Sequence, residues 1–171
     1  MPARPMQRFL PAADVCVHDE PMSDVRIIRA APEHCEILSA LHGEGFAKPW
    51  SREEFAALLE QPGVAAWIGE NAEPSGFILV RAAADEAEIL TLSVRPQQRR
   101  LGLGASLLKT ACEALSTSGT RQMFLEVSAE NTAAIALYRK LGFAARGIRP
   151  GYYEGGKESP VADAVIMAKA L

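Results

Sequence analysis

The sequence lacks the features that would place the protein in a membrane, outside the cell or around a metal ion. No apolar run reaches the roughly 18 residues that a membrane-spanning helix needs, and Pro11 and Asp14 interrupt the N-terminal stretch that would form the core of a signal peptide. The three cysteines are widely spaced, without the paired short spacings of a zinc or redox motif. We therefore expect a cytoplasmic protein with reduced cysteines, no metal and no membrane contact.

The chain also lacks a basic excess, an internal repeat and any low-complexity block. Its formal net charge of -3 argues against a general attraction for nucleic acid. A length of 171 residues with 49% hydrophobic residues suits one globular core. Residues 1–24 hold four prolines and show no periodicity, which indicates a tail of unknown role. Residues 25–171 are predicted to form a single domain.

The most informative stretch is residues 89–105, where an apolar strand pattern gives way to an arginine-rich turn and then to an amphipathic helix. Gly102 and Gly104 have no Cβ, so the backbone can take positive φ and approach a ligand closely. The first N–H groups of the following helix have no partner inside it, and the helix dipole favours an anion there. The turn also contains three basic side chains, Arg95, Arg99 and Arg100. This pattern predicts a phosphate site.

The rest of the chain predicts a mixed α/β sheet. Strands are expected at residues 25–29, 64–69, 76–81, 86–94, 123–127 and 164–167, and helices at 32–43, 51–61, 103–117 and 131–141. The strand, helix and strand of residues 86–127 predict a right-handed crossover and one parallel pair. Ser51 and Glu54 form a capping-box signature for the second helix. The histidines form no ligand cluster, and we expect His34 and His42, which flank the first helix, at the surface or at its caps.

Two common nucleotide loops do not fit the glycine turn. In a P-loop, Lys and then Ser or Thr follow the glycines directly, but here Lys109 and Thr110 lie well inside the helix. A dinucleotide fingerprint needs a third small residue where this chain has Leu107, and an antiparallel meander precedes the turn. Neither nucleotide class is therefore favoured.

The run Arg99-Arg100-Leu101-Gly102-Leu103-Gly104, preceded by Leu92-Ser93-Val94, resembles the pyrophosphate motif of the GNAT superfamily of acetyl-CoA-dependent N-acetyltransferases. The resemblance implies the GNAT acyl-CoA N-acyltransferase fold, a mostly antiparallel mixed sheet with a splayed parallel strand pair, flanked by helices. It also implies a bulge at residues 92–94, whose backbone pairs with the pantetheine arm. The implied acetyl-CoA ligands are Leu92, Ser93, Val94, Arg99, Arg100, Leu101, Gly102, Leu103, Gly104, Ala105, Asn131 and Tyr138.

A closer resemblance is to the RimI-type ribosomal-protein alanine N-acetyltransferases. It rests on Pro49-Trp50-Ser51, Leu125-Glu126-Val127, the block from Asn131 to Phe143, Tyr152-Tyr153 and residues 163–167. The implied walls of the acceptor groove are Phe46, Trp50, Tyr152 and Tyr153. Two alternatives stay open: Phe46 and Trp50 close one side of the core, and the tyrosines are ordinary aromatics of a hairpin surface.

Two residues are candidates for proton transfer. Glu126 lies in an otherwise apolar strand, where an unpaired charge is unfavourable; it is either a general base for the incoming amine or the partner of an arginine in a structural ion pair. Asn131 and Tyr138 are seven residues apart, so one helix face is expected to present both to the cofactor. A tyrosine phenol can protonate a departing thiolate, and the alternative for Tyr138 is a core residue.

The resulting hypothesis is acetyl transfer from acetyl-CoA to a protein N-terminal α-amine, with the alanine of a small-subunit ribosomal protein as the implied acceptor. The amine attacks directly, and Cys112, on an apolar helix face, is not needed as a nucleophile. We expect a monomer or weak dimer without direct contact to nucleic acid. The alternatives are a lysine or small-molecule amine N-acetyltransferase of the same fold, and a CoA-binding regulatory module without turnover.

Overall fold

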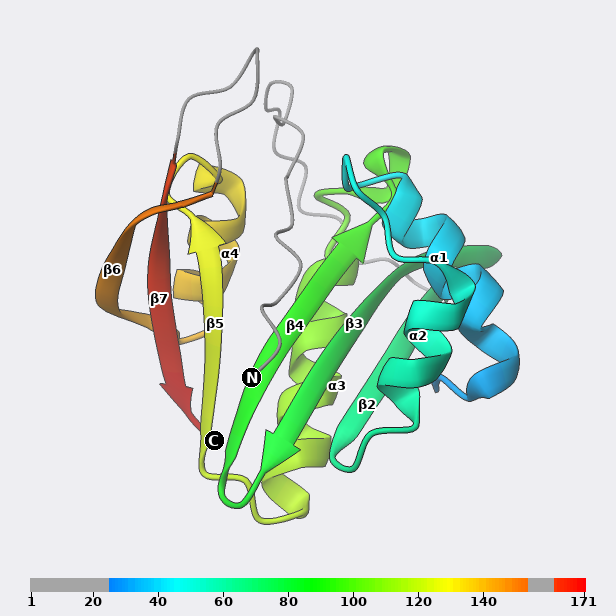
Figure 1. Cartoon of the computed structure of the whole chain (residues 1–171), viewed down its shortest axis with the longest axis horizontal. Helices are drawn as coiled ribbons and strands as arrows, with labels where there is room; N and C mark the ends of the chain where they lie inside the picture. The colour runs from blue at the N-terminus through cyan, green and yellow to red at the C-terminus, as the bar shows by residue number, and fades with distance from the viewer. Residues whose placement is uncertain (1–24, 154–161) are drawn as a thin grey trace.

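A computed structural model describes residues 25–153 and 162–171 of the chain. They form one seven-stranded sheet in the order β1-β2-β3-β4-β5-β7-β6 (Figure 1). The strands are β1 Arg26–Arg29, β2 Val64–Asn71, β3 Glu73–Ala83, β4 Glu86–Val94, β5 Gln122–Ser128, β6 Ala144–Tyr153 and β7 Ala162–Ala170. The helices are α1 Cys35–Gly43, α2 Arg52–Leu59, α3 Leu103–Thr117 and α4 Thr132–Lys140, with 3₁₀ turns at Pro32–His34 and Pro96–Gln98. The predicted tail, residues 1–24, lies outside the described residues, so the division into tail and domain stays a prediction.

Helices cover both faces of the sheet: α1 and α2 lie on one face, and α3 and α4 on the other (Figure 1). Each layer has its own apolar cluster. Phe55 of α2 clusters with Ile68, Phe77 and Leu79 of the sheet, whereas Leu107 of α3 clusters with Met123, Leu125 and Val127. Alternation along each strand therefore tells which face a side chain occupies.

The predicted splay of a parallel pair is confirmed. β4 and β5 pair in parallel only from Glu86 opposite Gln122 to Glu88 opposite Phe124. Beyond that point the two strands diverge (Figure 1), and β5 continues along β7 instead, from Gln122 to Ser128. Within the part of the chain that the structure describes, no strand pairs with the edge of β4 that faces this opening, so its backbone groups are available to a ligand.

The expected bulge is present in β4 but at another residue. The register of β4 against β3 shifts between Ile89 and Thr91, which leaves Leu90 as the extra residue. Residues 92–94, where the resemblance placed the bulge, pair regularly with β3. A bulge reverses which alternate side chains face a given side. As a result, odd-numbered residues before the bulge and even-numbered residues after it pack on the α3 side, namely Ala87, Ile89, Leu92 and Val94.

One strand was missed and one helix is shorter than expected. β6 was not predicted, because Gly147, Pro150 and Gly151 break its pattern, and its register against β7 shifts twice. Helix α2 ends at Leu59 rather than near residue 61, and the predicted capping box at its start is present. The other elements are present near their predicted positions, but β3 and β7 are longer than predicted, and a 3₁₀ turn at Pro32–His34 precedes α1.

Candidate active site

The glycine turn leads directly into the N-terminus of α3. Gly102 is the N-cap residue, with φ +90°, a conformation that favours glycine. The first bond that closes the helix runs from the Ser106 N–H to the Gly102 carbonyl, at 3.0 Å. In the described part of the chain, the N–H groups of Leu103, Gly104 and Ala105 therefore have no acceptor. Three parallel donors at a helix start fit a phosphate group.

The two glycines of the motif have different roles. Gly104 lies inside the first turn of α3 and has no positive φ, so that expectation was wrong for it. A Cβ on Gly104 would lie 3.4 Å from the Leu137 side chain of α4, which is an ordinary van der Waals contact. A Cβ on Gly102 would meet no protein atom within 4 Å. Backbone conformation, rather than packing, is what requires glycine at position 102.

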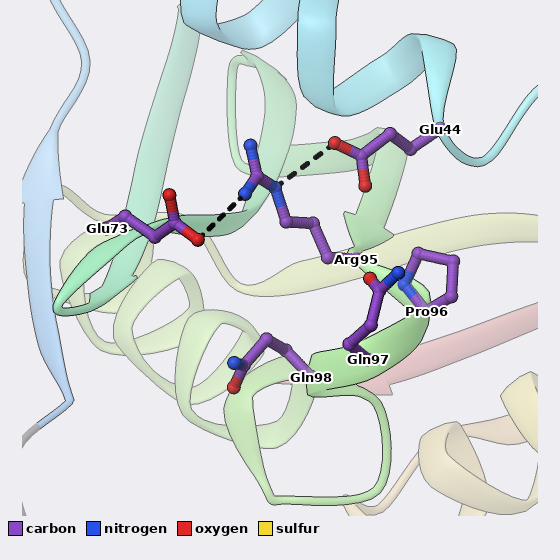
Figure 2. A pocket seen from close by; sticks show the side chains of 6 residues that line it. All are labelled: Glu44, Glu73, Arg95, Pro96, Gln97 and Gln98. Carbon is purple, nitrogen blue, oxygen red and sulfur yellow. Dashed lines mark ion pairs between the residues drawn. The ribbon is translucent and has the colours of Figure 1, made fainter.

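Arg95 does not add its charge to the phosphate loop as expected. Its guanidinium forms ion pairs with Glu44, at 3.1 Å, and with Glu73, at 3.2 Å (Figure 2). These residues line a cavity of about 610 Å³ together with Pro96, Gln97 and Gln98. Because Glu44 caps α1 and Glu73 begins β3, Arg95 joins three elements at the end of β4. Its charge is already balanced.

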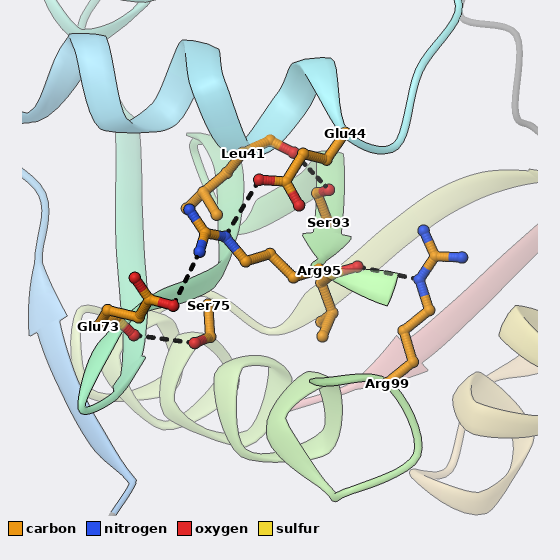
Figure 3. Close-up of polar contacts among 8 residues, drawn as sticks. Leu41, Glu44, Glu73, Ser75, Ser93, Arg95 and Arg99 are labelled. Carbon is orange, nitrogen blue, oxygen red and sulfur yellow. Dashed lines mark hydrogen bonds and ion pairs between the residues drawn. The ribbon is translucent and has the colours of Figure 1, made fainter. Parts of the chain in front are cut away.

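Arg99 and Arg100 supply the positive charge of the loop. Arg99 extends away from Arg95 and donates Nε to the Val94 carbonyl, at 3.0 Å (Figure 3). Arg100 is exposed and takes a left-handed φ of +63°, which is strained for a residue with a side chain. Leu101 beside it is 40% exposed. The loop thus presents cations, free N–H groups and an apolar side chain in one turn.

Residues 92–94 border the opening between β4 and β5. Leu92 and Val94 pack partly on the α3 side. The Ser93 hydroxyl points to the other face and donates to the Leu41 carbonyl of α1, at 3.1 Å (Figure 3). Their predicted contact with a cofactor would therefore use backbone groups rather than the Ser93 side chain.

Glu126 lies at the opening, two residues beyond the last pair of β4 with β5. Leu125 and Val127 face α3, so Glu126 projects from the opposite face, on the side of α1 and α2. Its side chain is 18% exposed and pairs with Arg149 of β6 at 3.1 Å. The ion pair that the sequence left open is thus present, with an arginine outside the loop.

Tyr138 lies on the other face, in the cluster with α3, and is 7% exposed. Its ring packs edge to face on Phe143, at 5.7 Å. Glu126 and Tyr138 therefore lie on opposite faces of the sheet. Asn131 precedes α4 as its N-cap, and its Oδ1 accepts from the Ala134 N–H at 3.1 Å. Only its amide NH₂ is left for another partner.

The expectation for His42 was wrong, because its side chain is fully buried. The imidazole stacks between Phe46, with centroids 4.0 Å apart, and Trp50, at 4.8 Å. Its Nδ1 accepts from the Trp50 N–H at 3.0 Å, and Ser39 of the same helix donates to the Trp50 carbonyl at 2.9 Å. Helix α1 therefore holds the loop after it by both backbone groups of Trp50. The apolar spacing of Leu38, Leu41 and His42 was the signal that could have revealed this.

Burial lowers the pKa of His42 from 6.5 to about 4, with Glu54 opposing the shift weakly. The ring is thus neutral at pH 7, and since Nδ1 is an acceptor, Nε2 carries the proton. Among the described residues this Nε2 has no hydrogen-bond partner. Phe46, 3% exposed, serves to pack against His42, whereas Trp50 is half-buried and reaches the surface. His34, as expected, lies at a helix start, where it accepts from the Ala31 N–H.

The paired tyrosines are described in part. The Arg149 guanidinium lies over the Tyr152 ring, at 4.9 Å from its centroid. Tyr153 ends β6 opposite Ala162, and residues 154–161, which a flap would include, lie outside the described residues. The flap therefore stays a prediction.

The remaining reactive groups among the described residues offer no second site. Cys35 and Cys112 are free and buried, and burial raises the pKa of both thiols, which disfavours the nucleophilic thiolate. The described ranges contain no group of three or more metal-ligating side chains. Over the same residues, no helix is long and apolar enough to cross a membrane.

Comparison with known proteins agrees with this geometry. Residues 31–143 match the acetyltransferase (GNAT) family. The ribosomal protein bS18-alanine N-acetyltransferase of Escherichia coli K12 is 36% identical over 80% of this chain and 92% of its own. The enzyme of the same name from Haemophilus influenzae is 31% identical over 78% of this chain and 90% of its own.

Two solved structures are similar. The crystal structure of the E. coli ribosomal-protein-S18-alanine N-acetyltransferase superposes with a TM-score of 0.78 at 30% identity, covering 86% of this chain and 94% of that one. Arabidopsis thaliana NAA60, in complex with a bisubstrate analogue, gives a TM-score of 0.74 at 20% identity over 86% and 98% of the two chains. The latter similarity concerns the fold alone.

The buried neutral His42 predicts a loss of stability in acid. In the unfolded chain His42 takes up a proton below about pH 6.5, whereas in the folded protein it does so only near pH 4. The free energy of unfolding should therefore fall by up to about 3 kcal/mol between these two pH values. Urea unfolding at pH 7, 6, 5 and 4 measures the slope. His42→Asn keeps an acceptor for Trp50 but does not titrate, so its slope should be shallower. Equal slopes in both proteins would contradict the assignment.

Proposed function

The chain belongs to the GNAT family of acetyltransferases, and from this premise we propose that it transfers the acetyl group of acetyl-CoA to the N-terminal α-amine of a ribosomal protein that begins with alanine. The observation that carries the proposal is the similarity, along nearly the whole domain, to relatives named for this activity. Three features of the described chain support it: the unpaired N–H groups at the start of α3, the open edge of β4, and the position of Glu126 just beyond the last pair of β4 with β5.

The described residues fit acetyl-CoA, which supplies an activated acyl group as a thioester. The N–H groups of Leu103, Gly104 and Ala105, with Arg99 and Arg100, would hold the diphosphate. The backbone of residues 92–94 would pair with the extended arm. The exposed Leu101 and the Asn131 amide NH₂ would add contacts. No metal is required by this arrangement.

Glu126 would act as the general base. A protein α-amine has a pKa of about 7.7–8.0, so a substantial neutral fraction exists at pH 7 and the carboxylate need only assist its deprotonation. Tyr138, on the opposite face, would donate a proton to the departing thiolate. In this proposal the base and the acid act from opposite faces of the sheet, so each proton moves without the two groups exchanging it directly.

The acceptor would enter from the face that carries α1 and α2. Trp50 and Tyr152 are the described aromatics on that path, with Tyr153 at the end of β6. Phe46 is too buried to contact the acceptor and would act through the stack with His42. This burial supports the alternative that Phe46 closes the core rather than lines the acceptor groove.

The acceptor proposal is tested with a peptide panel. We expect acetylation of peptides with a free N-terminal alanine, and none of the same peptides with a blocked N-terminus and internal lysines. Mass spectrometry locates the added acetyl group, and release of the CoA thiol measures turnover. Acetylation at lysine side chains alone would contradict the acceptor, and CoA binding without thiol release from any amine would contradict catalysis.

The catalytic roles predict graded losses. Glu126→Gln should lower kcat by about 10- to 100-fold, because the base assists rather than carries the reaction, and Tyr138→Phe by about 100-fold. Steady-state rates with a saturating peptide measure both. Glu130→Gln, which removes an exposed carboxylate four residues from Glu126, is the matched control and should leave kcat unchanged. Wild-type rates in both catalytic variants would refute the assignment.

The two glycines should respond differently in acetyl-CoA binding. Gly102→Ala places a side chain at φ +90°, which costs about 1–2 kcal/mol and should turn the donors of α3 away, raising the KM for acetyl-CoA about tenfold. Gly104→Ala meets only an ordinary contact with Leu137 and should change KM by less than about threefold. Initial rates over a range of acetyl-CoA concentrations, at a fixed peptide concentration, give the KM of each variant. Equal effects at both positions would argue against the backbone role of Gly102.

A further inference from the structure

The ion pair between Glu126 and Arg149 crosses a whole strand. In the order β5-β7-β6, Glu126 is opposite Ile166 and Arg149 is opposite Ala164, so the two charged side chains reach diagonally over β7. The path is open because Ala164 is small. Both oxygens of Glu126 lie near the same Arg149 nitrogen, at 3.1 and 3.4 Å.

The irregular end of β6 directs Arg149 to this position. Between Arg149 and Tyr153 the register against β7 shifts, and Gly151 has φ +62°. The Gly151 N–H donates to Asp163 Oδ1 of β7 at 2.9 Å, which holds the bulge. The guanidinium is then placed between the Glu126 carboxylate and the Tyr152 ring. One cation therefore contacts the candidate base and a candidate acceptor wall.

Stability alone does not account for this arrangement. The Arg149 side chain is 51% exposed, and ion pairs with such an exposed partner contribute little to folding. A planar guanidinium that contacts both a carboxylate and a ring fixes their relative position more closely than a lysine can. Such a group is suited to orient the carboxylate at the opening.

We propose that Arg149 is a positioning residue: it holds the Glu126 carboxylate at the opening between β4 and β5 and links it to Tyr152. The proposal rests on the role of Glu126 proposed above. Arg149 transfers no proton itself. It keeps the base within reach of an amine that enters along Tyr152.

The test compares kinetic constants of full-length variants. Arg149→Met keeps the length of the side chain but removes its charge, and should lower kcat about tenfold or more, since a misplaced catalytic group loses up to about 10²-fold. The KM for acetyl-CoA should stay within about twofold, because the phosphate loop is on another element. Arg149→Lys should recover part of kcat. Arg146→Met, at an exposed arginine of the same strand, is the control and should match wild type.

A double-mutant cycle separates positioning from a merely structural role. If Arg149 acts through Glu126, Arg149→Met should have no further effect on kcat in the Glu126→Gln background. Multiplicative losses, or a wild-type kcat in Arg149→Met, would overturn the proposal. A circular-dichroism melt of each variant verifies that it is folded at the assay temperature.

The outcome is distinguishable from failure of the proposed function. The cycle runs with whichever amine the peptide panel identifies. Acetylation confined to lysine side chains would overturn the acceptor, while a kcat loss that vanishes in Glu126→Gln would still support Arg149. Conversely, if N-termini are acetylated and Arg149→Met has the same kcat as wild type, the proposed function stands and this inference is overturned.

Discussion

The structure depends on one short pairing, that of β4 with β5. If the two strands paired along their whole length, there would be no opening between them. Neither Glu126 nor the edge of residues 92–94 would then be accessible to a ligand. The pairing ends at Glu88 and Phe124, and beyond it β5 keeps its pairing with β7 on its other edge while β4 keeps its pairing with β3. No strand of the described chain pairs with the edge of β4 that this divergence exposes, and an extended ligand can pair there.

The charged residues around the site form separate groups on different elements. Three arginines stand near the glycine turn, yet Arg95 is balanced by Glu44 and Glu73 and ties α1 to β3 and β4. Arg99 and Arg100 follow in the glycine turn itself, and Arg100 is exposed. On the other face, Glu126 and Arg149 balance each other. An acidic chain can thus hold a polyanion locally, because its positive field is confined to one turn.

Local signals allowed much of this fold to be predicted. The strand, glycine turn and helix of residues 89–105, the capping box at Ser51 and the parallel crossover follow from short-range patterns, and the structure contains all three. Contacts between distant segments were out of reach. The partner of Glu126 comes from β6, a strand hidden by its glycines and proline, and the burial of His42 depends on aromatics that fold back from the next loop. The bulge at Leu90 was misplaced because register is a property of two strands, not one.

The stack of His42 between Phe46 and Trp50 has a consequence for the evolution of this surface. A neutral ring with one nitrogen bound to the Trp50 backbone and the other without a partner is neither a good apolar filler nor a fully satisfied polar group. Substitutions of Phe46 or Trp50 must therefore preserve a flat face for the imidazole as well as any contact with the acceptor. Substitutions along this loop are therefore freer at Ala47 and Lys48, which are exposed and take no part in the stack.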